Sequence, residues 1–250
     1  IAELVGSEVP VMGGSSADDD VRGAWAQLAG PARLSGAVVV AALFPSAELG
    51  FAFQSGYAPT ARAGRVEART GRRLERIDGE PAADWYRARA GVELPEAPAN
   101  VLAASSFAPL GRACGEVDGI TTHLLLHPER LHADGSLSTF AEVEAGEVLC
   151  VMEGTRASLV SRAGRVARDA LELSELDPAD LAGALVTYCG GCRLAVEDQL
   201  EEVVRGIRAG LPGVPFLGAF TFGETGRMGD ENRHGNLMIS VLVFGREQGA

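Results

Sequence analysis

Hydrophobic and polar positions follow two different periods along this chain, and the changes of period delimit its elements. Short apolar runs bounded by Gly, Pro, Asn or Asp predict strands, and apolar residues recurring every three or four positions predict helices. Strands are predicted at residues 9–12, 37–44, 49–54, 66–70, 72–77, 120–126, 137–143, 147–152, 185–188, 215–222 and 237–244. Most are short enough to be single buried strands of a sheet.

Four stretches follow the helical period instead. Their apolar positions are Val21, Trp25 and Leu28; Ala82, Trp85 and Tyr86; Leu159, Ala163, Val166 and Ala170; and Val196, Leu200, Val203, Val204 and Ile207. Asp18, Asp19 and Asp20 precede the first set, where negative charge meets the positive end of a helix dipole. Pro81 suits the first turn of the second helix, Gly91 ends that helix, and Thr155 can cap the third. Asp134-Gly135 predicts a turn before the strand at 137–143.

Together these elements predict an α/β fold (mixed α+β) built from two sheet-containing units with helices packed against the sheets. Residues 1–112 are rich in predicted strands, and residues 113–250 alternate strand and helix with short connections. We therefore expect a β-rich unit at 1–112 and an α/β unit at 113–250.

Composition places the chain among globular proteins, with 46% hydrophobic and 22% charged residues. The longest apolar runs, Ala37–Pro45 and Leu237–Phe244, fall short of the ~20 residues that a membrane-spanning helix needs. The first residues show no signal peptide. We expect an intracellular and mainly cytoplasmic protein without a transmembrane segment, or an organellar one if an upstream targeting segment has been removed.

Charge and residue usage narrow the function. The formal net charge of −12 argues against nucleic acid as a partner, because phosphate binding depends on clustered Lys and Arg. The chain contains no Lys, which excludes Schiff-base chemistry and lysine-based phosphate cradles. No Gly-x-Ser-x-Gly elbow and no Ser/His/Asp set is present. We therefore predict an acidic protein that is not an enzyme.

Cysteine usage indicates a reducing compartment. The four cysteines do not form a disulfide framework in a chain of this length, and Cys150 lies in an apolar run that predicts a free buried thiol. Cys189-Gly190-Gly191-Cys192 has the spacing of a redox dithiol or of half a zinc site. A structural or pocket-lining role is the third interpretation, and the spacing alone does not separate the three.

The histidines do not form a metal-binding helical pair. His123 and His127 lie four positions apart in a strand-like run, where strand rise separates them by about 13 Å. Haem ligation by one histidine is left open. The sequence requires no cofactor.

Several segments resemble FIST domains. An apolar strand that ends in Gly223-Glu224, followed by His234-Gly235-Asn236 before a last apolar strand, is similar to the C-terminal signature of that family, as is the strand that ends at Cys189. Three further segments are similar to its N-terminal half, namely 10–19, 53–57 and 77–82. The likeness extends over nearly the whole chain, without the opening portion of a usual N-terminal half.

The resemblance implies a non-catalytic sensory or adaptor module that binds a small ligand such as an amino acid. Some bacterial relatives are similar to haem-dependent gas sensors, and eukaryotic members accompany F-box adaptors. The implied pocket lies at strand ends and takes as candidate ligand-binding residues Cys189, Gly223, Glu224, Asn236, Gly13 and Gly14.

Some of these residues have a second interpretation. Glu224 follows a strand and could receive a ligand cation there, or it could cap local backbone N–H groups. Asn236 could fix its own loop. Gly13-Gly14 could cradle an anion before a helix, but the acidic residues that follow favour a tight turn.

Two alternative functions stay open at this stage. One is a thiol-redox or metal-binding protein centred on Cys189 and Cys192, and the other is an accessory subunit of a larger assembly with a protein partner. The ligand, the partner and the oligomeric state are not determined by the sequence.

Overall fold

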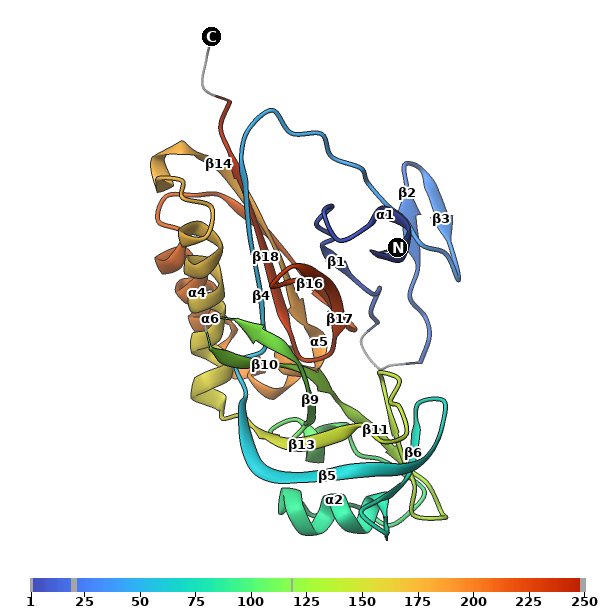
Figure 1. The fold of residues 1–250 in the computed structure, drawn as a ribbon. Coiled ribbons are helices and arrows are strands. Elements are labelled where there is room, and N and C mark those ends of the chain that lie inside the picture. Colours follow the sequence, from blue (N-terminus) through green and yellow to red (C-terminus); the bar gives the residue numbers. More distant parts are fainter. Residues whose placement is uncertain (1, 19–21, 118, 248–250) are drawn as a thin grey trace.

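A computed structural model describes residues 2–18, 22–117 and 119–247. The predicted mixed α/β class is confirmed, because the described residues form several sheets with helices packed against them (Figure 1). No helix among the described residues has the length and apolar character needed to cross a membrane.

A four-stranded sheet forms the first layer. Its strands run in the order β15 (Phe216–Thr221), β14 (Leu181–Cys189), β18 (Ile239–Gly245) and β4 (Leu49–Gln54). The β14 and β15 strands are parallel, and the other neighbours are antiparallel. The helices α4 (Arg156–Glu172) and α6 (Leu200–Gly210) lie side by side along this sheet (Figure 1).

The predicted α4 helix is confirmed, cap included. The Thr155 hydroxyl accepts a hydrogen bond from the Ser158 backbone N–H, and the Ser158 hydroxyl accepts one from the Thr155 N–H, which completes a capping box. The predicted apolar stripe, from Leu159 to Ala170, is buried against the sheet. A Cβ on Gly164 would lie 2.7 Å from the Gly206 carbonyl oxygen of α6, so glycine permits this close helix contact.

A nine-stranded sheet forms the other main layer. Its strands run in the order β10 (Ile120–Leu126), β9 (Leu110–Val117), β13 (Val148–Glu153), β5 (Ala58–Thr70), β6 (Arg73–Ile77), β12 (Leu137–Thr139), β11 (Pro128–Leu131) and β8 (Ala99–Asn100), with β7 (Glu80–Pro81) paired to β6. The strands predicted at 66–70 and 72–77 form and pair with each other in β5 and β6.

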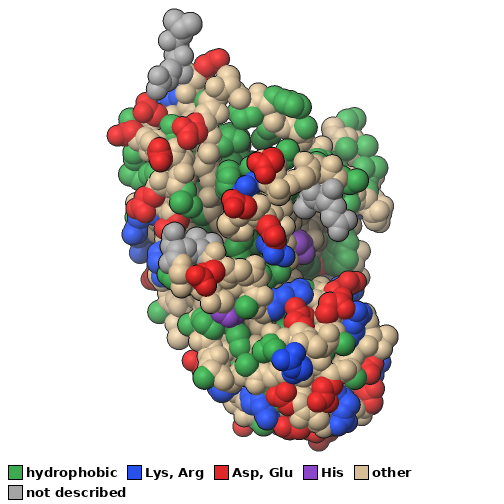
Figure 2. Space-filling model, in the orientation of Figure 1, with side chains coloured by type: hydrophobic (Ala, Val, Ile, Leu, Met, Phe, Trp, Pro, Cys, Tyr) green, Lys and Arg blue, Asp and Glu red, His purple; other side chains and the backbone are tan. Residues whose placement is uncertain are grey.

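The helix α2 (Ala82–Ala90) packs on this second sheet and carries the fully buried side chains of Trp85 and Tyr86. It ends as predicted at Gly91, whose φ of 66° is the left-handed conformation that glycine adopts without strain. On the face of the molecule seen in Figure 2, Arg, Asp and Glu side chains are interspersed over the region of the nine-stranded sheet. Arg62–Glu153 and Arg69–Glu144 are two of the ion pairs among them.

A small sheet joins the two ends of the chain. It consists of β1 (Gly13–Gly14), β16 (Glu224–Met228) and β17 (Glu231–Gly235), which lie beside β4 and β18. The strand predicted at 9–12 is wrong, because the Asn232 side chain takes the place of a neighbouring strand. Its Oδ1 accepts from the Val11 N–H and its Nδ2 donates to the Val9 carbonyl, both at 2.8 Å.

The helix predicted between Asp18 and Gly30 is also wrong in its described part; Asp19, Asp20 and Val21 lie outside the described residues. The Asp18 carboxylate accepts hydrogen bonds from the backbone N–H groups of Arg22 and Ala24 and closes a turn instead. Gly23 has a φ of 87°, which a right-handed helix does not permit. Gln27–Ala29 (β2) then pairs with Ala32–Leu34 (β3).

The strand predicted at 37–44 does not form. Phe44 is 93% exposed and Val38 is 74% exposed, and the segment runs extended before β4. A strand requires a hydrogen-bonded neighbour, which an apolar pattern cannot supply by itself.

The remaining α-helices are short. They are α1 (Ala2–Val5), α3 (Leu102–Ser105) and α5 (Gly190–Ala195).

The two hydrophobic cores do not divide at one point of the chain. Strand β4 completes the sheet of β14, β15 and β18, and β13 completes the sheet of β5. The boundary suggested between residues 112 and 113 falls inside β9.

Candidate functional site

The two parallel strands β14 and β15 end side by side. Cys189, the last residue of β14, is in register with Thr221, the last residue of β15. The chain continues from Cys189 directly into α5, and from Thr221 through Phe222 and Gly223 to Glu224. Residues from the ends of both strands therefore meet at one edge of the sheet, where α/β proteins commonly bind ligands.

A cavity of about 330 Å³ opens at this edge, and we call it the Cys189 cavity. Much of its wall is apolar and comes from α3, the loop after it, and α5. The lining residues are Asn100, Leu102, Ala103, Ser106, Phe107, His127, Phe140, Arg156, Cys189, Gly191, Leu194, Ala195, Phe222, Gly223 and Asn236. Cys189, Gly223 and Asn236 from the predicted set are among them.

Glu224 lies behind this wall and is fully buried. Its Oε1 accepts a hydrogen bond from the Thr221 hydroxyl at 2.8 Å, and its Oε2 accepts one from the Met238 N–H at 3.0 Å. Burial raises the pKa of this carboxyl to about 8, although both hydrogen bonds favour the ionised form. The side chain is therefore mainly neutral at pH 7 and has both oxygens occupied by the protein.

Gly13 and Gly14 form β1 and pair with Thr225 and Glu224 of β16. They therefore support the strand that carries Glu224, and they do not line the Cys189 cavity. A Cβ on Gly14 would lie 2.5–2.7 Å from three Thr221 side-chain atoms, so only glycine fits there without displacement. The structure brings this pair and the Gly223-Glu224 pair together from opposite ends of the chain.

Asn236 presents an unpaired acceptor at the cavity. The residue is 6% exposed, and its Oδ1 has no hydrogen-bond partner among the described residues. A buried amide oxygen without a partner costs free energy, so a ligand donor at this atom would recover part of that cost.

His127 was not singled out as a pocket residue by the sequence. It is 3% exposed, lines the cavity, and places its Nε2 at 3.2 Å from the Leu102 carbonyl oxygen. Burial lowers the pKa of the ring to about 4, against the hydrogen bond to Leu102, and the imidazole is therefore neutral at pH 7. Haem ligation by a histidine stays a prediction.

Cys192 lies deeper than Cys189, in a cluster with Arg162, Tyr57 and Tyr188. Cys192 and Arg162 are both fully buried, and the guanidinium lies over the Tyr57 and Tyr188 rings at 5.8 and 5.0 Å. Sequence reasoning missed Arg162, although a signal was available. The residue stands three after Leu159 and four before Val166, which places a charged side chain on the apolar stripe of α4.

All four cysteines are free thiols, and Cys150 is buried as predicted. Among the described residues, no group of three or more His, Cys, Asp and Glu side chains is placed to hold a metal ion. Cys189 and Cys192 thus belong to no such group in that part of the chain.

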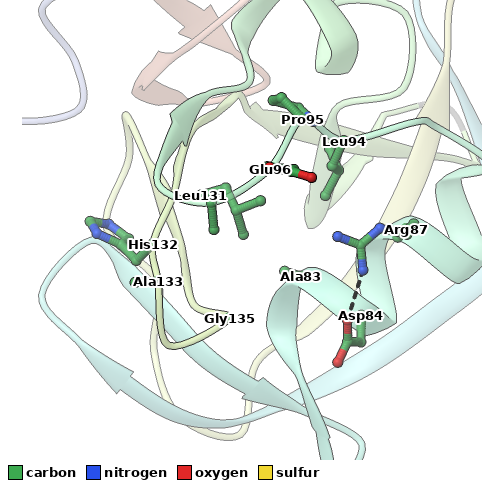
Figure 3. A pocket seen from close by; sticks show the side chains of 11 residues that line it. Ala83, Asp84, Arg87, Leu94, Pro95, Glu96, Leu131, His132, Ala133 and Gly135 are labelled. Carbon is green, nitrogen blue, oxygen red and sulfur yellow. Dashed lines mark hydrogen bonds and ion pairs between the residues drawn. The ribbon is translucent and has the colours of Figure 1, made fainter.

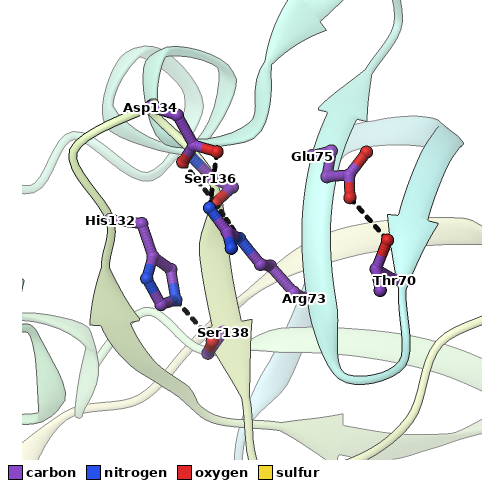
Figure 4. Close-up of polar contacts among 7 residues, drawn as sticks. All are labelled: Thr70, Arg73, Glu75, His132, Asp134, Ser136 and Ser138. Atoms are coloured by element: carbon purple, nitrogen blue, oxygen red, sulfur yellow. Dashed lines mark hydrogen bonds and ion pairs between the residues drawn. The ribbon is translucent and has the colours of Figure 1, made fainter.

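A second cavity, of about 260 Å³, lies beside α2 and is built differently (Figure 3). Arg87 and Asp84 pair with each other on its rim at 2.7 Å. In the nearby β11–β12 turn, Asp134 accepts hydrogen bonds from Arg73 and from the Ser136 hydroxyl and N–H (Figure 4). These bonds lower the pKa of Asp134, the Arg73 bond foremost, and they stabilise the turn predicted at Asp134-Gly135.

The fold and the Cys189 cavity together define an α/β protein with a ligand-sized pocket at the carboxyl ends of parallel strands. The FIST N domain family matches residues 1–80, and the FIST C domain family matches residues 82–227. Because the second match alone covers more than half of the chain, the protein belongs to the FIST family, and the predicted resemblance is confirmed. Comparisons with curated proteins and with solved structures find no significant match.

Proposed function

We propose that this chain is a non-catalytic sensory module that binds a small molecule in the Cys189 cavity. FIST domains are in general sensory, ligand-binding domains of signalling proteins. The observation that carries the proposal for this chain is the cavity itself, which lies at the ends of β14 and β15 and is lined by Asn236, whose buried Oδ1 has no partner among the described residues.

The chemistry of the wall favours a neutral and largely apolar ligand. Phe107, Phe140 and Phe222 contribute aromatic surface to it. The buried His127 ring, whose pKa is about 4, is neutral at pH 7. Arg156 lines the cavity too, but its guanidinium already pairs with Asp198 at 2.6 Å.

A ligand of this class would place an N–H or O–H group on Asn236 Oδ1 and its apolar body against the phenylalanine rings. A free amino acid, the ligand class implied by the family resemblance, would additionally bring an ammonium and a carboxylate. Burying these charges without partners is costly. Glu224 is the nearest candidate for the ammonium, but its oxygens bind Thr221 and Met238.

Thermal unfolding with a small panel tests the proposal. Indole and phenol represent neutral donors, tryptophan and tyrosine represent the corresponding amino acids, and haem represents a cofactor. A ligand that binds only the folded state at 100 times its Kd adds about 2.7 kcal/mol to the unfolding free energy. We expect indole or phenol to raise the midpoint more than the corresponding amino acid does.

Two variants assign the binding to the cavity. Ala195→Phe fills the Cys189 cavity, and Ala133→Phe is its matched control in the cavity beside α2. Stabilisation should disappear in the first variant and persist in the second. An equal response of both variants would place the ligand elsewhere, and no response to any compound in a folded sample would overturn the proposal of sensing by this cavity.

A further inference from the structure

The buried side chains around Cys192 form a cluster to which the proposed ligand binding assigns no role, apart from Cys189. The titratable and charged groups that act on the Cys192 sulfur are Tyr57, Arg162, Tyr188, Cys189 and Glu224. Tyr57 lies in the loop before β5, Arg162 in α4, Tyr188 and Cys189 at the end of β14, and Glu224 at the start of β16. The Tyr57 hydroxyl lies 3.6 Å from Cys192 Sγ, and Cys189 stands three residues before Cys192 at the end of β14.

Charge balance in this cluster depends on Cys192. The Arg162 guanidinium donates through Nη1 to the Ser55 and Leu237 carbonyl oxygens, but its Nε and Nη2 make no hydrogen bond to the described residues. No salt bridge in the described part of the chain joins Arg162 to a carboxylate. A fully buried cation without a counter-charge is strongly destabilising.

The Cys192 thiolate supplies that counter-charge. Burial opposes its ionisation, but the hydrogen bond with Cys189, the charge of Arg162 and the hydrogen bond with Tyr57 together lower its pKa to about 6. Cys189 differs, because its hydrogen bond to Cys192 and its burial raise its pKa. Cys189 is thus the neutral thiol of the pair and also the one that lines the cavity.

We propose that Cys189 and Cys192 form an oxidisable dithiol, in which hydrogen peroxide in the cavity reacts at Cys189 and the pair then closes to a disulfide. In the first step the Cys189 sulfur attacks one peroxide oxygen while its proton passes to the Cys192 thiolate. The peroxide O–O bond breaks, and the departing hydroxide takes that proton and leaves as water. Cys189 is then a sulfenic acid, and Cys192 is again a thiolate.

In the second step the Cys192 sulfur attacks the Cys189 sulfur, the S–O bond breaks, and hydroxide leaves. The two sulfurs lose two electrons in total, and peroxide gains them. The local backbone suits closure, since the cysteines stand at i and i+3 at the start of α5. Side chains at this spacing have Cβ atoms about 5–6 Å apart, and a disulfide brings them to about 3.8 Å. Only Gly190 and Gly191 lie between them.

Oxidation removes the thiolate and leaves the Arg162 charge without its counter-charge. A disulfide that closes so short a loop restricts the unfolded chain only slightly. We therefore expect the oxidised protein to unfold at a lower temperature than the reduced protein, whereas a purely structural dithiol would be unreactive or would gain stability when bridged.

The experiment treats the full chain with stoichiometric hydrogen peroxide, counts free thiols and maps the cross-linked peptides by mass spectrometry. A Cys114→Ser, Cys150→Ser background removes the other thiols. We expect two thiols to be lost per chain, with one disulfide joining Cys189 to Cys192. Cys192→Ser removes both the base of the first step and the attacking thiolate of the second, so Cys189 should react more slowly and stop at a sulfenic acid that dimedone traps. Cys189→Ser should leave Cys192 reduced, because Cys192 is fully buried.

Circular dichroism confirms that each variant is folded before treatment. If a single variant fails to fold, the reaction of the Cys114→Ser, Cys150→Ser background alone still decides the question. Two unreactive thiols in that folded background, or oxidation of Cys189 to a sulfinic acid without a disulfide, would overturn the proposal.

Discussion

The Thr221 hydroxyl donates a 2.8 Å hydrogen bond to Glu224 Oε1 at the point where β15 turns into β16. This contact holds a buried carboxyl directly behind the wall of the Cys189 cavity. Its environment favours the protonated form, which ties the stability of the cavity edge to pH.

The pH dependence of Glu224 can be measured. Its folded pKa of about 8 lies above the ordinary value of 4.5, so the folded state holds the proton more tightly. The stabilisation is complete below pH 4.5, declines as pH rises and is lost once pH passes 8. Glu224→Gln should remove a dependence on the order of a few kcal/mol from urea unfolding curves. Glu153→Gln, at an exposed position, is the control variant.

His127 should make the unfolding free energy depend on pH in the opposite direction, with a loss of stability at acid pH. Its folded pKa of about 4 lies below the ordinary 6.5, so the stabilisation of the neutral ring is complete above pH 6.5 and is lost as pH falls through 4. His127→Gln retains a donor for the Leu102 carbonyl and should flatten the acid limb of the unfolding free energy. His123→Gln serves as the control, and an unchanged acid limb in His127→Gln would contradict this assignment.

The contact between β1 and β15 predicts a size-dependent effect. Gly14→Ala would place its Cβ within 2.7 Å of the Thr221 side chain and should destabilise the fold by about 1–3 kcal/mol. Thr221→Ser removes the methyl group and keeps the hydroxyl for Glu224, so the double variant should recover part of the loss. Gly218→Ala meets only the Val186 carbonyl oxygen at 3.9 Å and should be tolerated. The measurement is the unfolding free energy of the two single variants and of the double variant, and the expected result is that the changes do not add.

The capping box of α4 should contribute separately from the site. Thr155→Ala removes the oxygen that accepts from the Ser158 N–H at 3.0 Å and should cost about 1 kcal/mol of unfolding free energy. Ser161→Ala, on the exposed side of the same helix, should change it by less than about 0.5 kcal/mol. Equal effects of the two substitutions would show that the cap contributes nothing particular.

Local patterns predicted those parts of the fold in which neighbours in sequence supply the stabilising contacts. The apolar spacing from Leu159 to Ala170, the Thr155 cap and the Gly91 ending are of this kind, and the structure confirms them. The strand predicted at 37–44 does not form, for the opposite reason. Its composition suits a buried strand, but a strand exists only where a partner is within hydrogen-bonding distance.

The candidate site divides in the same way. The sequence alone identified Cys189, Gly223 and Asn236 from their motifs, and the structure places all three on one cavity. It did not bring Arg162, Tyr57 and His127 to this site, because they reach it from other elements. Arg162 did carry a local signal, since it stands on the apolar stripe of α4. Their roles arise from burial and from charges brought close by distant parts of the chain.

The sequence by itself therefore determined the FIST family, the mixed α/β class and the residues at the strand ends, because each is written in short stretches of the chain. Tertiary structure decided which of these residues meet. It paired Gly14 with Glu224, placed Arg162 beside Cys192 and opened the Cys189 cavity between the strand ends and α3. The physical reason is that pairing, burial and pKa depend on neighbours in space, which only the folded chain defines.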